Sequence, residues 1–186
     1  MTEIHTDSLR SERLKFHYRF CGDADGLPMV LLHGSFASSR WWELFLNILP
    51  RAVRAFAPDL RGGGSTEKPE DGYTIPEFSD DVWSFTQALR LEGFDLVGHS
   101  SGGASATEYA LRHPDVVRTL TLVDSAPVEG VFTPTETLRV LDQMRTDEEL
   151  LRRALRILMP TLDMAGTTGT VENGKFFDSL IDDATQ

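Results

Sequence analysis

The sequence predicts an α/β fold in which helices flank a mostly parallel sheet, because short apolar runs alternate with longer amphipathic segments. Residues 98–102 read GHSSG and lie between an apolar run and a helical segment, the strand–turn–helix context of a serine exposed on a sharp turn. Beyond Asp124 the alternation stops and helical segments follow one another. We therefore expect a sheet-containing core over residues 1–126 and a helical lid over residues 127–186.

The predicted strands are short apolar runs bounded by turn residues, as buried strands of a parallel sheet are. The first is an opening strand or hairpin arm that ends at a glycine- and aspartate-rich turn, and the last is rich in β-branched residues and leucine. In chain order they are Leu14–Phe20, Met29–Leu32, Val53–Ala57, Phe94–Val97 and Val116–Val123.

The predicted helices have one apolar face and recognisable ends. Residues 41–49 form one with a wide apolar face, and Thr74 with Glu77 makes a capping box that opens the next. A helix over Ser101–His113 ends at Pro114, where the chain cannot continue helically. In the lid, capping boxes at residues 133–136 and 146–149 open two helices, residues 161–173 are a flexible stretch, and Phe176–Ile181 starts a third helix.

Composition and charge narrow the classes of partner. A chain of 186 residues can bury one sizeable core, and a net charge of −11 argues against binding nucleic acid or an anionic membrane. The single cysteine, Cys21, permits no internal disulfide and favours a reducing compartment. Residues 1–13 are charged, unlike a signal peptide, and no apolar run reaches membrane-spanning length. We expect a cytoplasmic protein with no nucleic-acid or membrane partner.

Two further motifs each follow a predicted strand: residues 33–36 read HGSF and residues 59–65 read DLRGGGS. Together with GHSSG they resemble the α/β-hydrolase family, whose members show an HG-x turn, a D-x-R-G-x-G loop and G-x-S-x-G in this order. The resemblance runs from about Leu14 to about Pro127, and the lid fits it more loosely. It implies an α/β-hydrolase core, incomplete in this chain, with Asp59 and Arg61 holding their own loop together.

The motifs assign roles to individual residues. Ser100 is the predicted nucleophile, and the backbone N–H of Ser101 is one oxyanion-hole donor because it follows the nucleophile at a helix N-terminus. By resemblance, the backbone N–H of Ser35 is the second donor. Relatives that open epoxides or displace halide carry aspartate at the elbow, so a serine implies acyl transfer on a small ester, lactone or related acyl substrate. No cofactor or metal is expected, and the expected substrate contacts are His33, Gly34, Phe36 and His99.

The sequence leaves two candidate positions for the acid of a Ser–acid–His triad. Asp124 ends the strand that follows the elbow helix, where a carboxylate can reach the site, and some relatives carry the triad acid there. Most relatives carry it after the next strand, a position that would lie beyond Gln186.

No general base is identifiable in the sequence. After Ser100 the one histidine is His113, about 13 residues or about 20 Å away along a helix, whereas a base must lie within about 3 Å of the hydroxyl. We expect the C-terminal core strands and the triad histidine to be missing from this chain, and a second copy or a complementing C-terminal chain to cover the last strand. The leading hypothesis is a serine hydrolase with an acyl-enzyme; the alternative is a non-catalytic or degenerate α/β-hydrolase-like protein or fragment.

Overall fold

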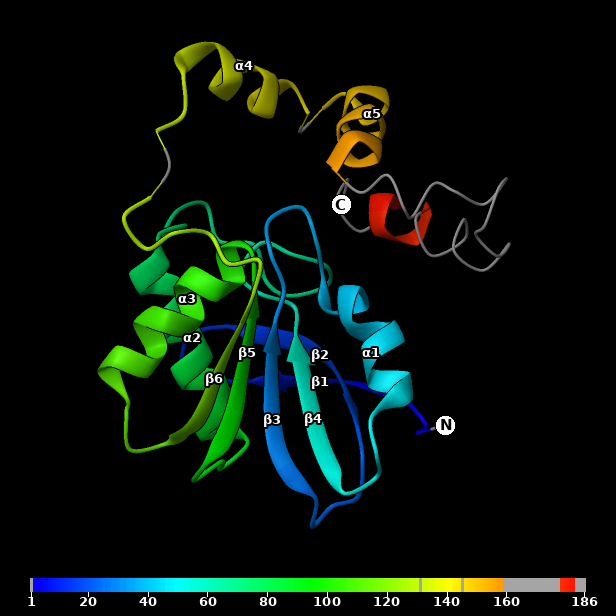
Figure 1. The fold of residues 1–186 in the computed structure, drawn as a ribbon, viewed down its shortest axis with the longest axis vertical. Helices are drawn as coiled ribbons and strands as arrows, with labels where there is room; N and C mark the ends of the chain where they lie inside the picture. Colours follow the sequence, from blue (N-terminus) through cyan, green and yellow to red (C-terminus); the bar gives the residue numbers. More distant parts are fainter. Residues whose placement is uncertain (1, 131, 145, 159–177, 183–186) are drawn as a thin grey trace. The chain divides into compact units, whose positions relative to one another are not determined.

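The computed structural model describes residues 2–130, 132–144, 146–158 and 178–182. The chain divides into two compact units, Met1–Gly130 and Val131–Gln186. The first unit contains the sheet and every residue singled out for chemistry, and the second contains the helices of the predicted lid (Figure 1). No helix among the described residues is both long and apolar enough to cross a membrane.

The first unit is built on a six-stranded sheet of order β1-β2-β4-β3-β5-β6, and the predicted α/β class is confirmed. The two N-terminal strands pair antiparallel, and the remaining four run parallel to one another. The strands are β1 (His5–Arg10), β2 (Lys15–Cys21), β3 (Leu27–Leu32), β4 (Val53–Pro58), β5 (Phe94–His99) and β6 (Val117–Val123).

Helices cover both faces of this sheet (Figure 1). On one face lie α2 (Ile75–Ala88) and α3 (Ser101–Arg112), and on the other lie the short helix η1 (Ser39–Trp42) and α1 (Glu43–Ile48). Side chains alternate between the faces along β3: Val30 joins the cluster beneath α2 and α3, whereas Leu31 joins the cluster beneath η1 and α1. Burial on both faces explains why the central strand β3 reads as an unbroken apolar run.

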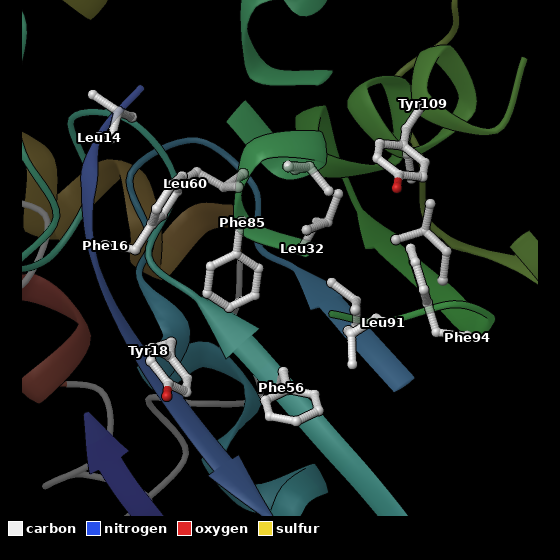
Figure 2. Packing of buried hydrophobic residues seen from close by; sticks show 14 residues of the cluster. Leu14, Phe16, Tyr18, Leu32, Phe56, Leu60, Phe85, Leu91, Phe94 and Tyr109 are labelled. Carbon is white, nitrogen blue, oxygen red and sulfur yellow. The ribbon is translucent and has the colours of Figure 1, made fainter. Parts of the chain in front are cut away.

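The larger cluster centres on the ring of Phe85, which is fully buried. Its centroid lies 5.2 Å from that of Phe16 and 5.4 Å from that of Tyr18, an aromatic contact between α2 and β2 (Figure 2). Tyr18 in turn lies 6.3 Å from Phe56 on β4. These contacts hold α2 against the sheet.

Two details of the first unit differ from the sequence prediction. Strand β1 was not predicted, because its residues are polar and mostly exposed and it pairs at the edge with β2 alone. The single helix expected over residues 41–49 is instead η1 followed by α1. The break arises because the side chain of Ser38 accepts the Arg40 N–H at 3.1 Å and starts a tight turn ahead of the α-helix. The capping of α2 by Thr74 is confirmed.

In the second unit, both predicted helices form but their caps differ. Helix α4 (Thr135–Gln143) follows Pro134 and has no side-chain cap, and α5 (Glu148–Leu158) is capped by Asp147, whose carboxylate accepts the Leu150 N–H at 2.9 Å. Aspartate competes well with threonine for this position. Residues 178–182 are helical, whereas the expected flexible stretch 161–173 lies outside the described residues. A small apolar cluster holds this unit: Met144, Leu151, Leu155 and Ile181.

Candidate active site

Ser100 occupies a sharp turn between β5 and α3, with φ of 53° and ψ of −123°. A side chain in this region of φ costs about 1–3 kcal/mol, so the surroundings must impose it. They do: the Ser100 N–H donates to the carbonyl of Val123 at 3.2 Å, and its carbonyl accepts the N–H groups of Gly103 and Ala126, each at 2.9 Å. The Ser100 hydroxyl makes no hydrogen bond with any residue the structure describes, so it is available to react.

Close approach explains the two glycines of the motif. A Cβ atom added at Gly98 would lie 2.5 Å from the carbonyl oxygen of Gly102, and one added at Gly102 would collide with the carbonyl of His33. The start of α3 therefore packs directly against the ends of β3 and β5, as the predicted strand–turn–helix context requires. This packing aims the N-terminus of α3 at the space beside Ser100.

The loop after β3 lies against the same turn. A Cβ atom added at Gly34 would be 2.8 Å from the Cβ of Ser100, so Ser35 follows immediately beside the expected nucleophile. The hydroxyl oxygens of Ser35 and Ser101 are 3.0 Å apart. Ser101 is the first residue of α3, and the N–H groups at that position have no partner within a helix. The structure thus brings together Ser100 and both residues expected to form the oxyanion hole.

His33 is almost fully buried and both of its ring nitrogens are engaged. Nδ1 lies 2.8 Å from the carbonyl of Gly34, and Nε2 accepts the N–H of Leu60 at 2.8 Å, so the ring is a neutral imidazole with its proton on Nδ1. We predicted a substrate contact for His33, and its burial instead makes it a link between the loops that follow β3 and β4. The same two bonds leave it no nitrogen with which to serve as a general base.

His99 packs against Trp41 and against the loop that follows β3. Its ring stacks on Trp41 at 4.6 Å between centroids, and a Cβ atom added at Gly34 would be 3.2 Å from its Nδ1. Burial lowers the pKa of His99 below its ordinary value, and the negative charge of Asp124 acts in the opposite direction. The lowered pKa favours a neutral ring at pH 7. Of the other expected contacts, Gly34 is buried, while Phe36 is exposed with φ of 57°.

Asp124 follows β6 directly and is exposed, with φ of 45°. Because the Ser100 N–H binds the carbonyl of Val123, Asp124 lies at the same edge of the sheet as the elbow. Its carboxylate makes no hydrogen bond with a described residue. The position is compatible with a triad acid, and the assignment stays a prediction.

Asp59 and Arg61 hold the loop after β4 in place. The buried carboxylate of Asp59 accepts the N–H groups of Ser39 at 2.7 Å and Ser65 at 2.9 Å, and it lies 2.9 Å from Nδ1 of His17. Arg61 makes a two-pronged ion pair with Asp81, with Nε–Oδ2 at 2.7 Å and Nη2–Oδ1 at 2.9 Å. Both residues therefore bind protein rather than project into the space beside Ser100.

Asp59 is expected to make stability depend on pH. Burial alone raises its pKa, but the hydrogen bonds from His17 and Ser39 outweigh burial and lower the pKa to about 2, below the ordinary value of an aspartate. The stabilisation is therefore full above about pH 4 and is lost as the pH falls toward 2. Asp59→Asn should lower the free energy of unfolding at pH 7 by about 2–3 kcal/mol in urea titrations. Asp115→Asn, at an exposed position, should change it by less than about 0.5 kcal/mol; equal effects would contradict the assignment.

Sequence reasoning missed two contacts of the site, the Ser35–Ser101 hydroxyl pair and the stacking of His99 on Trp41. The signal for the first was present, because a serine follows both the HG turn and the nucleophile. The side chain of Ser101 was given no role, because an oxyanion hole requires only the backbone N–H of this residue.

Comparison with known proteins agrees with this geometry. A sequence model of the alpha/beta hydrolase fold matches residues 28–168. A 2-hydroxymuconate semialdehyde hydrolase from Pseudomonas sp. (strain CF600) is 38% identical over 116 residues, covering 58% of this chain and 40% of that protein. A non-heme chloroperoxidase from Streptomyces lividans is 33% identical over 141 residues, covering 73% of this chain and 51% of that protein.

Among solved structures, the 2-hydroxy-6-oxo-6-phenylhexa-2,4-dienoate hydrolase from Rhodococcus sp. strain RHA1 shares the fold, with a TM-score of 0.79 and 23% identity. The match covers 100% of this chain and 68% of that one. The chain thus spans about half the length of the curated relatives it matches. Because the family model matches well over half of the sequence, the chain belongs to the alpha/beta hydrolase fold family.

Proposed function

We propose that this chain carries the nucleophile and the oxyanion hole of a serine hydrolase that acts, without a cofactor, on a small ester, lactone or related acyl substrate. The observation that supports the proposal most is the strained conformation of Ser100, at φ of 53°, pinned through its own N–H and carbonyl while its hydroxyl stays unengaged. Strain of this kind persists where the surrounding structure imposes it, and it is typical of nucleophile turns.

The proposed reaction has two halves. The Oγ of Ser100 attacks the carbonyl carbon of the substrate and loses its proton to a base, and the carbonyl oxygen becomes an oxyanion held by the N–H groups of Ser35 and Ser101. Collapse of this tetrahedral intermediate breaks the bond to the leaving group, which takes up a proton, and leaves an acyl group on Ser100. Water then attacks the acyl-enzyme through a second oxyanion and releases the acid.

Partitioning of the acyl group tests this covalent intermediate. In ester hydrolysis with added methanol, the ratio of methyl ester to acid should be the same for a p-nitrophenyl ester and a phenyl ester of one acid, because both would pass through the same acyl-enzyme. Ratios that depend on the leaving group would contradict a common intermediate. We also propose that α4 and α5 belong to a lid that sets substrate choice.

The general base is proposed to come from outside the residues described here. None of the five histidines, all within the described ranges, hydrogen-bonds the Ser100 hydroxyl, and His113 stacks on Trp83 at 3.9 Å beyond the far end of α3. Among the described residues β6 pairs with β5 alone, and Leu120 and Leu122 are exposed on it. We propose that a C-terminal segment or a second chain adds to this edge and brings a histidine.

The pH dependence of hydrolysis should reveal that histidine. A neutral imidazole accepts the Ser100 proton, so activity should rise with pH through an apparent pKa near about 7 once the base is supplied. The 186-residue chain alone should turn over slowly and should lack this rise of activity with pH. A longer protein that carries the added segment should show the rise. If the 186-residue chain alone hydrolysed esters at the full rate, with activity rising through a pKa near about 7, both the external base and the non-catalytic alternative would be contradicted.

A further inference from the structure

We propose that the paired hydroxyls of Ser35 and Ser101 supply a third, side-chain donor to the oxyanion hole. The two oxygens lie 3.0 Å apart, and either can be the donor within the pair. The inference rests on the proposed function and deepens it, because it assigns the pair a hydrogen bond to the oxygen that becomes negative when Ser100 attacks a carbonyl.

The position of the pair follows from the two segments that carry it. Ser35 belongs to the loop after β3, and Ser101 is the first residue of α3. The backbone N–H groups of these same two residues are the expected oxyanion donors. A Cβ atom at Gly34 would lie 2.8 Å from the Cβ of Ser100, so both segments meet at the nucleophile. The hydroxyl pair therefore links the two segments that carry the expected backbone donors.

A count of protons shows that one donor is left over. Two hydroxyls carry two protons, and the bond between them uses one. Neither hydroxyl has another partner among the described residues, so the second proton is free to donate. Ser35 is exposed and Ser101 half-buried, which leaves that proton accessible to a substrate. A hydroxyl that accepts one hydrogen bond while donating another is a stronger donor, and an oxyanion is the acceptor that gains most from it.

Nearby hydroxyls on the same segments have structural partners instead. Ser38 accepts the Arg40 N–H, Ser39 accepts a hydrogen bond from Arg19, and Ser105 donates to the carbonyl of Ser101 one turn back along α3. The pair of Ser35 and Ser101 differs because neither hydroxyl is bonded to backbone. Ser105 is thus a matched control, a serine on the same helix whose hydroxyl serves the helix itself.

The test compares Ser35→Ala, Ser101→Ala and their double variant with Ser105→Ala in the protein that carries the proposed general base, using an activated ester. Loss of the third donor should lower kcat about 10- to 100-fold with KM changed less than about twofold, because the bond forms only in the transition state. The double variant should fall no further than the worse single variant, since the two act as a unit. Ser35→Thr, which keeps the hydroxyl, should restore most of kcat, and Ser105→Ala should match the wild type.

Phenylboronic acid gives a second readout that needs no turnover, because its tetrahedral adduct with Ser100 mimics the intermediate. Its affinity should fall in the alanine variants by the same factor as kcat. If the alanine variants kept the wild-type kcat and boronate affinity, the third donor would be contradicted. The proposed function would still hold in that case, provided that turnover depended on Ser100. A lower kcat that tracks a lower melting temperature and is not restored by Ser35→Thr would assign the pair to loop tethering and also overturn it. Activity that survives Ser100→Ala would instead remove the proposed function itself.

Discussion

In the protein that carries the proposed general base, Ser100→Ala should lower kcat for an activated ester by about 10⁴-fold or more, because the proposed acyl-enzyme forms on the Ser100 hydroxyl. The free energy of unfolding should change little. The Ser100 hydroxyl has no hydrogen bond to a described residue, and alanine meets the same backbone strain at φ of 53° as serine does. Steady-state kinetics and urea unfolding of the same preparations measure the two effects separately.

Residual activity has a defined meaning in this experiment. An intact oxyanion hole alone can leave hydrolysis about 10³- to 10⁴-fold faster than in water, so a slow background rate is compatible with the loss of the nucleophile. The control is Ser105→Ala, which removes the same hydroxyl group from a buried position on α3 and should retain the wild-type kcat. A Ser100→Ala protein with the wild-type rate would show that another group performs the chemistry.

Gly34→Ala should lower kcat about 10²- to 10³-fold by displacing one side of the oxyanion hole. The added Cβ would lie 2.8 Å from the Cβ of Ser100, closer than real Cβ atoms approach, and at a tight 3.2 Å from Nδ1 of His99. The loop that carries Ser35 must therefore move away from the nucleophile. KM for a small ester should change much less than kcat, because the lost contacts act on the transition state.

The matched control for this prediction is Gly93→Ala, just before β5. A Cβ there meets nothing closer than the Cγ of Arg118 at 3.9 Å, so kcat should be unchanged. Circular dichroism and unfolding midpoints of both variants separate a displaced loop from a disrupted fold. Wild-type kcat in a folded Gly34→Ala protein would contradict the placement of Ser35 in the oxyanion hole.

The fold was predictable where burial shapes the sequence. The central strands are buried on both faces, so β3 and β5 read as apolar runs that no loop would carry. Edge strand β1 is exposed and selected for little apolar character, and its pairing with β2 is not visible in its composition. The split of residues 39–48 into η1 and α1 depends on the cap that Ser38 forms, which a hydrophobic period does not report.

The site was predictable where a backbone constraint restricts residue type. The turn at Ser100 has no room for side chains at positions 98 and 102, so the glycines there predict the turn. Contacts between distant segments leave no such mark: Ser35 and Ser101 are 66 positions apart, and each is an unremarkable serine by itself. The stacking of His99 on Trp41 likewise follows from how η1 crosses the end of β5, which only the three-dimensional arrangement supplies.

The most direct test of the proposed nucleophile is covalent labelling with a fluorophosphonate, followed by proteolysis and mass spectrometry of the labelled peptide. The phosphonyl group should be found on Ser100 alone, at no more than one group per chain, and Ser100→Ala should remain unlabelled. Labelling should persist in Ser105→Ala. A phosphonyl group on Ser35 or Ser101, or ester hydrolysis by a protein whose Ser100 stays unlabelled after prolonged exposure, would contradict the account.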